Sequence, residues 1–495
     1  MHDTLHQLQN FLTQWSQTIT LIGITLLYLA AFATVIHILL VKRDSRAALG
    51  WIVACLGFPG IGTIFYLLFG INRIKMRAEN LHAENTWDSD LQQQTASLDK
   101  IFSEKQHLDQ ETLRHLMNIS ENIIAKSDAK RPLQTDCNVE PLYNGEEAYP
   151  RMLNAIENAK QNIFLLTYIF ETNITGKEFI HALSKARDRG VDVKVLLDGV
   201  GCLYSFPSAV RLLKKKGVRV EKFLPPSFSK GGLHLNLRNH RKILTIDGVV
   251  AFTGGMNLGD RHLQNTKRPV GDVHFAVKGP IVGQIQDIFL SDWFFVTKER
   301  PEKTIPFDPS PKGEMICRAI TSGPNEDLEK LRLIYTGALS CAKKKIRIMT
   351  PYFLPDTAMI SALNNTVLRG ADVEIFLPQK NNLPYVKWAS QAILWELLNY
   401  DVKIYYQQGP FVHSKLLLID DFYAMVGSAN LDPRSLRLNF ELNLEVYDRS
   451  FTEKLNQHFE EVKKNSKRVT LEDIDKRHVL AKLRDGAAKI FSPYL

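Results

Sequence analysis

The chain has 495 residues, which at roughly 150 residues per domain suggests about three domains and excludes a single small fold. Its 45% hydrophobic and 23% charged residues exclude wholesale disorder, because such a chain can bury a core. A formal net charge of +9 favours anionic partners such as nucleic acid, phosphorylated metabolites or anionic lipid. Five cysteines without a C-x-x-C pair argue against a disulfide scaffold and against a cysteine-built metal site.

The N-terminal region contains two long uncharged segments. Residues 19–41 are long enough to cross a bilayer as a helix. Residues 47–70 are interrupted by glycines and Pro59, so this segment is either a kinked span or a re-entrant hairpin. Three basic residues follow each segment, which leaves the orientation open by the positive-inside rule: Lys42, Arg43 and Arg46, then Arg73, Lys75 and Arg77. We predict a membrane helical hairpin over residues 1–77, with spans at about 19–41 and 47–70.

Beyond a polar stretch, residues 78–135, which we predict to be a helical connector, the sequence repeats itself. The corresponding segments are 156–170 and 339–353, 190–197 and 370–377, and 217–220 and 401–404. Each reads as a helix, or a glycine that ends a helix, followed by a short apolar strand. We therefore predict an α/β fold with two duplicated α/β/α halves about a pseudo-twofold axis, residues 136–310 and 311–495. Residues 462–484 are predicted to form an amphipathic C-terminal helix.

Each half ends in the pattern H-x-K-x-x-x-x-D followed by G-G/S-x-N. Its members are His240, Lys242, Asp247 and Asn257 in the first half, and His413, Lys415, Asp420 and Asn430 in the second. Because residues i and i+2 of a strand share a face, each His and Lys are expected side by side. A turn at the Asp then returns a second strand, which delivers the small residues and the Asn. Lysine charge, an amide donor and exposed backbone N–H groups all suit a phosphate.

Two such halves would place two imidazoles on opposite sides of one phosphodiester. One neutral imidazole can attack phosphorus, while the other, protonated, donates to the departing alkoxide. Each imidazole also needs a carboxylate at its other nitrogen, and Asp272 and Glu441 are the candidates because each follows the motif of its half. Asp247 and Asp420 complete the predicted catalytic set, although a hairpin turn suits a structural salt bridge or turn hydrogen bonds equally.

These paired motifs resemble those of the phospholipase D superfamily, whose members form a phosphohistidine intermediate without a metal. Within it, the chain is similar to the bacterial cardiolipin synthases along nearly its whole length. The similarity lies in 239–243, 253–258, 427–435, the hairpin residues Trp51, Pro59, Phe69 and Gly70, and the closing residues 492–495. Tyr494 departs from the leucine that is usual in the family.

The resemblance implies a metal-free and cofactor-free transfer reaction. A histidine cleaves phosphatidylglycerol, glycerol leaves, and a second phosphatidylglycerol takes the phosphatidyl group to give cardiolipin. It further implies that His240 is the nucleophile, that His413 is the general acid and base, and that Asn257 and Asn430 bind the substrate phosphate. The expected location is the bacterial inner membrane, as a multi-pass protein, and the unpaired cysteines favour a cytoplasmic catalytic domain.

Family membership leaves the acceptor open. If water is the acceptor, the protein is a phospholipase D-type phosphodiesterase that hydrolyses phospholipid or nucleic acid. The apolar N-terminal region favours lipid over nucleic acid, and basic residues near the bilayer suit an anionic lipid. A lipid-binding protein with an inactive site is disfavoured, because both motifs are intact. No metal-ligand spacing, phosphate-binding loop or dinucleotide fingerprint occurs in the sequence, and homo-oligomer formation stays open.

Overall fold

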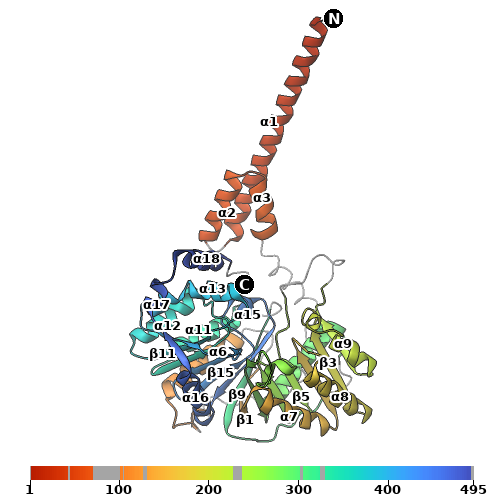
Figure 1. Ribbon diagram of the computed structural model, residues 1–495, viewed down its shortest axis with the longest axis vertical. Helices are drawn as coiled ribbons and strands as arrows, with labels where there is room; N and C mark the ends of the chain where they lie inside the picture. Colours follow the sequence, from red (N-terminus) through yellow and green to blue (C-terminus); the bar gives the residue numbers. More distant parts are fainter. Residues whose placement is uncertain are drawn as a thin grey trace. The chain divides into compact units, whose positions relative to one another are not determined.

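The structure is a computed structural model that describes residues 2–42, 45–70, 101–103, 105–125, 131–226, 237–300, 305–323 and 329–491. The chain divides into two compact units, Met1–Arg77 and Ala78–Leu495 (Figure 1). Much of the predicted connector lies outside the described residues, and α6 (Gln110–Ile124) is a helix near its end. The closing segment with Tyr494 also lies outside them.

The first unit consists of α1 (His2–Val41), α2 (Ser45–Gly57), α3 (Ile61–Phe65) and a π-helical turn (Tyr66–Gly70). Among the described residues, the 27 residues Trp15–Val41 form the one helix long and apolar enough to cross a membrane. The second apolar segment breaks at Pro59 and Gly60, where Gly60 has a φ of 91°. Because α2 has 13 residues, it is only about 20 Å long, shorter than the roughly 30 Å hydrocarbon core. The second segment is thus a broken helix and not a continuous span.

Among the described residues of the second unit, fifteen strands form one sheet, in the order β17-β12-β11-β10-β14-β15-β16-β9-β1-β8-β6-β5-β2-β3-β4, and β7 and β13 pair parallel as a separate two-stranded sheet. The first half contains β1 (Gln134–Tyr143), α7 (Asn144–Glu157), β2 (Asn162–Thr167), α8 (Ile174–Asp188), β3 (Asp192–Asp198), the 3-10 turn η2 (Gly201–Tyr204), α9 (Ala209–Lys215), β4 (Arg219–Phe223), β5 (Ile243–Ile246), β6 (Val250–Gly254), the 3-10 turn η3 (Asp260–His262), β7 (Val270–Gly271), β8 (Val273–Lys278) and α10 (Ile281–Thr297).

The second half repeats the main order of elements, except that β13 precedes its hairpin of β14 and β15, and it adds β17, α17 and α18. It contains β9 (Met315–Ser322), α11 (Lys330–Cys341), β10 (Lys345–Met349), α12 (Thr357–Leu368), β11 (Asp372–Pro378), α13 (Pro384–Gln391), α14 (Leu394–Leu398), β12 (Lys403–Gln407), β13 (Phe411–Val412), β14 (Leu416–Ile419), β15 (Tyr423–Gly427), α15 (Pro433–Arg437), β16 (Glu441–Tyr447), α16 (Arg449–Lys464), β17 (Ser466–Val469), α17 (Leu471–Asp475) and α18 (Val479–Ile490).

The sheet is symmetric about its centre, where β1 and β9 pair antiparallel. Outward from β1 the order β8-β6-β5-β2-β3-β4 matches the order β16-β15-β14-β10-β11-β12 outward from β9. Three strands in each half are parallel, β2-β3-β4 and β10-β11-β12. The predicted α/β fold with two duplicated halves is therefore confirmed.

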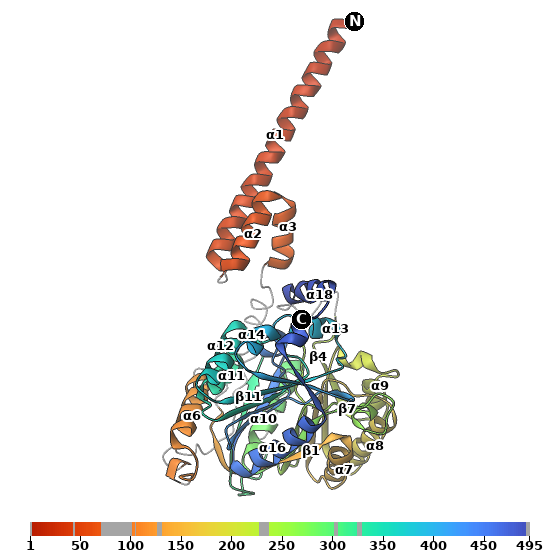
Figure 2. The same ribbon diagram turned by 60° about the vertical axis from the view of Figure 1, so that its left-hand side comes forward.

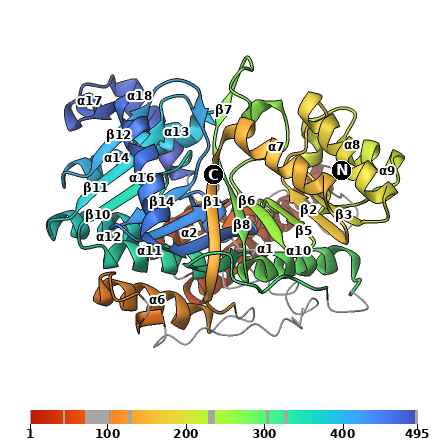
Figure 3. The ribbon, with the colours of Figure 1, turned by 90° about the horizontal axis from the view of Figure 1, so that it is seen from below.

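Helices cover the sheet in three groups, each over its own apolar cluster. In the first half α7, α8 and α9 cover one cluster, and in the second half α6, α11 and α12 cover another (Figures 2 and 3). A third cluster contains α10, α16 and strand residues of both halves. The shared cluster holds the two halves together, because strands from both contribute to one core.

The C-terminal region differs from the single helix predicted over 462–484. The helix α16 ends at Lys464, and β17 then pairs antiparallel with β12. A sheet edge offers unpaired backbone N–H and C=O groups, and pairing with them outweighs the helical periodicity of the segment. Two short helices, α17 and α18, follow.

Candidate active site

The two motif histidines lie at the junction of the halves. His240 precedes β5 and His413 precedes β14, so the His-x-Lys segments lie just before the strands and not within them. The His240 N–H donates to the Phe440 carbonyl at 2.9 Å, and the His413 N–H donates to the Gly271 carbonyl at 2.7 Å. The backbone of each histidine is therefore held by the opposite half.

The orienting carboxylates also cross between the halves. His240 Nδ1 lies 3.0 Å from Glu441 Oε2, and His413 Nδ1 lies 3.1 Å from Asp272 Oδ2. Both carboxylate side chains are fully buried. Since Nδ1 is engaged in each ring, Nε2 is the nitrogen left to react. The sequence identified both carboxylates, but it did not reveal that each one serves the histidine of the other half.

The two imidazole rings approach each other closely. Their centroids are 6.3 Å apart and their planes are inclined at 76°. Tyr168 contacts His240 edge-on at 5.4 Å between ring centroids, and Tyr352 contacts His413 in the same way at 6.3 Å. The sequence analysis missed both tyrosines, and the available signal was an aromatic residue just after each of the duplicated strands β2 and β10.

The motif lysines lie beside the histidines. Lys242 Nζ donates to the His240 carbonyl at 2.6 Å, and Lys415 Nζ lies 2.8 Å from His413 Nδ1. Burial lowers the pKa of Lys242 to about 7 and that of Lys415 to about 8. Nearby carboxylates oppose this shift, because they favour the charged ammonium. Both ammonium groups therefore titrate near neutral pH.

Burial also lowers the pKa of both histidines. For His240 the charge of Glu441 opposes the shift, whereas for His413 the charge of Lys415 adds to it. For Asp272, burial alone would raise the pKa, but Lys415 and the hydrogen bond from His413 outweigh it and lower the pKa. A neutral imidazole beside an ionised carboxylate is the state that nucleophilic attack by one of the two histidines requires, whereas the other must carry the proton for the leaving group.

The two motif asparagines lie at the strand ends next to the histidines. Ile243 of β5 pairs with Thr253 of β6, and this hairpin returns the chain to Asn257. The Asn257 Oδ1 accepts from the Ile169 N–H at 3.0 Å, which leaves its amide N–H groups as donors. Asn430 Nδ2 donates to Ser435 Oγ at 3.1 Å. Both asparagines are buried.

Asp247 and Asp420 lie away from the histidines and bind backbone N–H groups. They follow β5 and β14 and so lie at the opposite ends of these strands from the histidines. Both have a φ of 53°, and each carboxylate accepts three backbone N–H groups. The donors are residues 160–162 for Asp247, at 2.7 to 2.9 Å, and residues 343–345 for Asp420, at 2.7 to 3.2 Å. The geometry supports the turn role, because these carboxylates fix the starts of β2 and β10.

A buried network that the sequence analysis missed fixes the residues on both sides of His240. Asn239 Nδ2 donates to Asp292 Oδ2 at 2.9 Å, and Arg241 Nη1 lies 2.6 Å from Asp292 Oδ1. The Asn239 N–H donates to Asp198 Oδ2 at 2.9 Å. Asp292 lies in α10 and Asp198 ends β3, so no local pattern around the motif identifies either residue.

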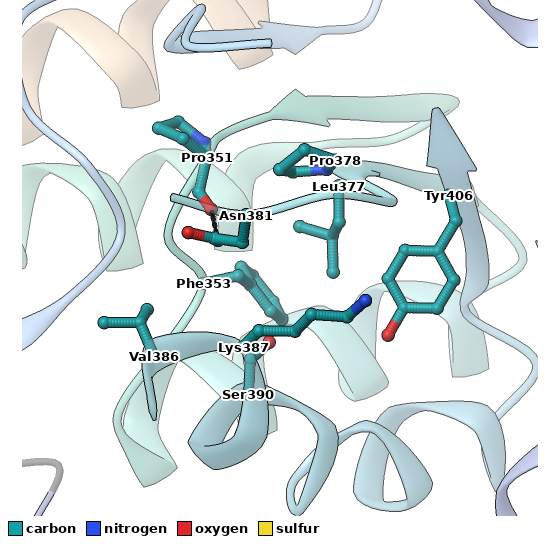
Figure 4. Close-up of a pocket in the computed structure, with 9 residues that line it drawn as sticks. All are labelled: Pro351, Phe353, Leu377, Pro378, Asn381, Val386, Lys387, Ser390 and Tyr406. Carbon is teal, nitrogen blue, oxygen red and sulfur yellow. Dashed lines mark hydrogen bonds between the residues drawn. The ribbon is translucent and has the colours of Figure 1, made fainter. Parts of the chain in front are cut away.

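A small pocket lies in the second half, between residues that follow β10 and β11 and residues of α13 (Figure 4). Its lining residues are Pro351, Phe353, Leu377, Pro378, Asn381, Val386, Lys387, Ser390 and Tyr406. Asn381 Nδ2 donates to the Pro351 carbonyl at 2.9 Å and fixes one wall. The pocket neighbours the site through Tyr352, but no residue of either motif lines it.

Comparison with known proteins gives two family matches and several full-length relatives. Residues 152–293 and 335–463 match the family "Cardiolipin synthase, PLD-like domain", and residues 29–70 match the phospholipase D-nuclease N-terminal family. Cardiolipin synthase 1 of Staphylococcus epidermidis is 34% identical over 469 residues, which are 92% of this chain and 94% of the relative. The major cardiolipin synthase of Bacillus subtilis is 32% identical over 470 residues, 92% and 95% of the two chains.

A solved structure shares the fold. The crystal structure of phosphatidylserine synthase from Haemophilus influenzae superposes with a TM-score of 0.59 at 16% identity, and covers 78% of this chain and 100% of its own. The matched family residues include both histidine motifs, and the relatives extend over nearly the whole chain. The chain therefore belongs to the cardiolipin synthase family of the phospholipase D superfamily.

Proposed function

We propose that the protein condenses two phosphatidylglycerol molecules to cardiolipin and glycerol through a phosphohistidine intermediate. The observation that carries the proposal is the pair of imidazoles 6.3 Å apart, each with a buried carboxylate on Nδ1. The named activity of the relatives supports the choice of lipid.

In the first step, His240 Nε2 attacks the phosphorus of the donor phosphatidylglycerol. The bond from phosphorus to the glycerol oxygen breaks, and protonated His413 gives its proton to the departing alkoxide. Glu441 stabilises the positive charge that develops on His240. The ammonium groups of Lys242 and Lys415 and the amide of Asn257 are the donors for the phosphate oxygens.

In the second step, His413 takes the proton from a hydroxyl of the acceptor phosphatidylglycerol. That oxygen attacks the phosphohistidine, and the bond from nitrogen to phosphorus breaks, which restores His240. One phosphodiester replaces another, so the exchange needs no external energy source. Because the halves are related by symmetry, the roles of His240 and His413 are the part of the proposal that needs its own test.

The test is lipid product analysis by mass spectrometry, with the purified full chain in phosphatidylglycerol vesicles. We expect cardiolipin and free glycerol, a loss of both with His240→Ala or His413→Ala, and no effect of a metal chelator. The control His181→Ala changes an exposed histidine of α8 and should keep wild-type activity. Phosphatidic acid as the sole product would mean that water is the acceptor, and would overturn the synthase proposal.

The order of the two histidines is tested by mapping the covalent adduct. In His413→Asn the second step lacks its base, so the phosphatidyl adduct should accumulate on His240 and appear in its peptide. The assignment would be reversed if His413→Asn gave no adduct on His240 while the matched variant His240→Asn accumulated an adduct on His413.

A further inference from the structure

The last helix, α18, directs its apolar face outward. Val479, Leu480, Leu483 and Ile490 are 65%, 69%, 63% and 75% exposed. With Ala487 they form one face at helical spacing, and the opposite face carries the small residues Ala481 and Ala488 together with buried Asp485. A surface helix normally buries its apolar face, so this arrangement is inverted. Single exposed leucines are ordinary, whereas a contiguous apolar face marks an interaction site.

Specific contacts hold α18 in this orientation. The buried carboxylate of Asp485 pairs with Arg477 and with Arg484, the latter at 2.9 Å. Lys489 Nζ lies 2.9 Å from Glu396 Oε1, and Ala488 packs against an apolar cluster that includes residues of α13. The outward apolar face is therefore a fixed feature of the fold.

A second exposed apolar element is the η2 loop, residues 201–206. Leu203 is 74% exposed and Phe206 is 95% exposed. The loop is anchored from within, since the N–H groups of Val200 and Gly201 both donate to Asp198 Oδ1. Gly201 packs so closely that a Cβ there would lie 1.6 Å from the Tyr168 carbonyl oxygen. The loop is thus held directly over Tyr168, one of the two tyrosines of the active site.

Each apolar element is linked to the histidine pair through a tyrosine that contacts a histidine. On one side Tyr204 of the η2 loop contacts Tyr168 at 6.3 Å between ring centroids, and Tyr168 contacts His240. On the other side Tyr352 contacts His413, and Tyr352 and Ala488 pack against the same apolar cluster. The η2 loop follows the carboxyl end of β3, and α13 beneath α18 follows the carboxyl end of β11. Since β3 and β11 are equivalent strands of the two halves, the η2 loop and α18 lie at the same edge of the sheet as the active site.

The charges beside α18 indicate what covers its apolar face. Lys482 and Lys489 border the face on one side and Arg484 borders it on the other, whereas the acidic Asp485 is buried and paired. An apolar helical face with basic borders is the pattern of helices that lie in the interface of an anionic bilayer. Although Lys489 and Arg484 also form ion pairs within the protein, basic residues at the borders of such a face place positive charge near the lipid headgroups.

We propose that the edge of the catalytic unit that carries the histidine pair docks onto an anionic bilayer through α18 and the η2 loop. Phosphatidylglycerol would then present its headgroup to the histidines while its acyl chains stay in the membrane. The inference rests on the proposed lipid substrate, and it adds a contact with the bilayer that is separate from the N-terminal apolar helix.

The first test measures depth in the bilayer by fluorescence quenching. The full chain carries Cys341→Ser, because the other four cysteines are buried, and one added cysteine labelled with an environment-sensitive dye. The labelled sites are Leu483→Cys, Leu203→Cys and the control Leu368→Cys. Leu368 is 68% exposed but precedes β11, at the opposite edge of the sheet. In phosphatidylglycerol vesicles with nitroxide-labelled lipid, we expect strong quenching at 483 and 203 and little at 368.

The second test compares two substrates with the double variant Leu480→Gln, Leu483→Gln. Its activity on phosphatidylglycerol vesicles should fall roughly tenfold, because two apolar side chains no longer enter the bilayer. Its activity on a water-soluble short-chain phosphatidylglycerol should match wild type, as should Leu368→Gln on both substrates. The docking proposal would be overturned if the dye at residue 483 were quenched no more than the dye at residue 368, or if the double variant lost equal activity on both substrates. Failure of the wild type to make cardiolipin would instead overturn the proposed function, while the quenching would still report docking.

Discussion

Four carboxylates near the two motifs divide by position into two kinds. Asp272 and Glu441 are buried against the histidines of the opposite halves, whereas Asp247 and Asp420 accept backbone N–H groups at the far ends of the strands. All four lie within or shortly after the repeated motifs, so sequence position alone does not separate them. Their hydrogen-bond partners separate them. A carboxylate that binds an imidazole is placed to act in the reaction, whereas one that binds backbone N–H groups is placed to stabilise the fold.

This division predicts opposite outcomes for matched amide variants. Glu441→Gln should lower kcat by roughly a hundredfold, because the neutral amide no longer stabilises the positive charge on His240. Asp247→Asn should leave kcat near wild type but lower the free energy of unfolding by about 1 kcal/mol, since three N–H groups lose an ionised acceptor. Steady-state kinetics and denaturant titration of both variants check this. A catalytic loss in Asp247→Asn at unchanged stability would contradict the assignment.

The lowered pKa values of the lysines predict an alkaline limit for activity. As the pH rises through about 7 to 8, Lys242 and Lys415 lose their protons in the free enzyme, so the positive charge that attracts the phosphate disappears. We expect kcat/KM to fall in this range. In Lys242→Arg the charge persists at the position that titrates first, so the fall should move to higher pH even though the maximal rate is lower, whereas Lys415→Arg should move it less. A profile of kcat/KM from about pH 5 to about pH 10 tests this, and an unshifted alkaline limit in both Lys→Arg variants would refute it.

At the scale of elements, the second apolar segment, which the sequence predicts to be either a kinked span or a re-entrant hairpin, shows how helix length limits what hydropathy predicts. Its lack of charge suggested a second span, but Pro59 and Gly60 end α2 after 13 residues, and α3 has five. Hydropathy reports how apolar a segment is, whereas the length of an uninterrupted helix decides whether it can cross. Both α2 and α3 pack against α1, which fits a re-entrant hairpin.

We therefore predict that the first unit crosses the membrane once, through α1. Reporter fusions at the N-terminus and after residue 77 should then report opposite sides of the membrane. A matched fusion in the α1–α2 connection should report the same side as the fusion after residue 77. Two crossings would instead place the N-terminal reporter and the reporter after residue 77 on one side.

At the scale of the whole molecule, one fifteen-stranded sheet joins the halves, and they exchange their orienting carboxylates. Neither half by itself contains a histidine together with its carboxylate. Each half therefore depends on the other for a working imidazole, and the shared apolar cluster with α10 and α16 fixes the two in register. The site is complete within one copy of the chain.

A mixing experiment follows from this completeness. His240→Ala and His413→Ala should each be inactive, and an equal mixture of the two should stay inactive, because neither copy can lend its intact half to the other. The measurement is cardiolipin formation in vesicles that contain both variants, with a mixture of wild type and His413→Ala as the control for reconstitution. Recovered activity in the mixture of the two variants would mean that the halves exchange between copies.

The sequence alone determined the duplication, the α/β class and the paired histidine motifs, and it offered Asp272 and Glu441 as candidates for orienting the histidines. These features can be read from local sequence patterns, namely residue spacing, strand periodicity and repeated segments, which do not depend on how distant parts of the chain pack. Only the tertiary structure decided that Asp272 and Glu441 serve opposite halves, that Asp292 fixes the neighbours of His240, and that α18 presents its apolar face outward. Contacts of this kind join residues far apart in the chain, so they depend on how the halves pack and leave no pattern in the local sequence.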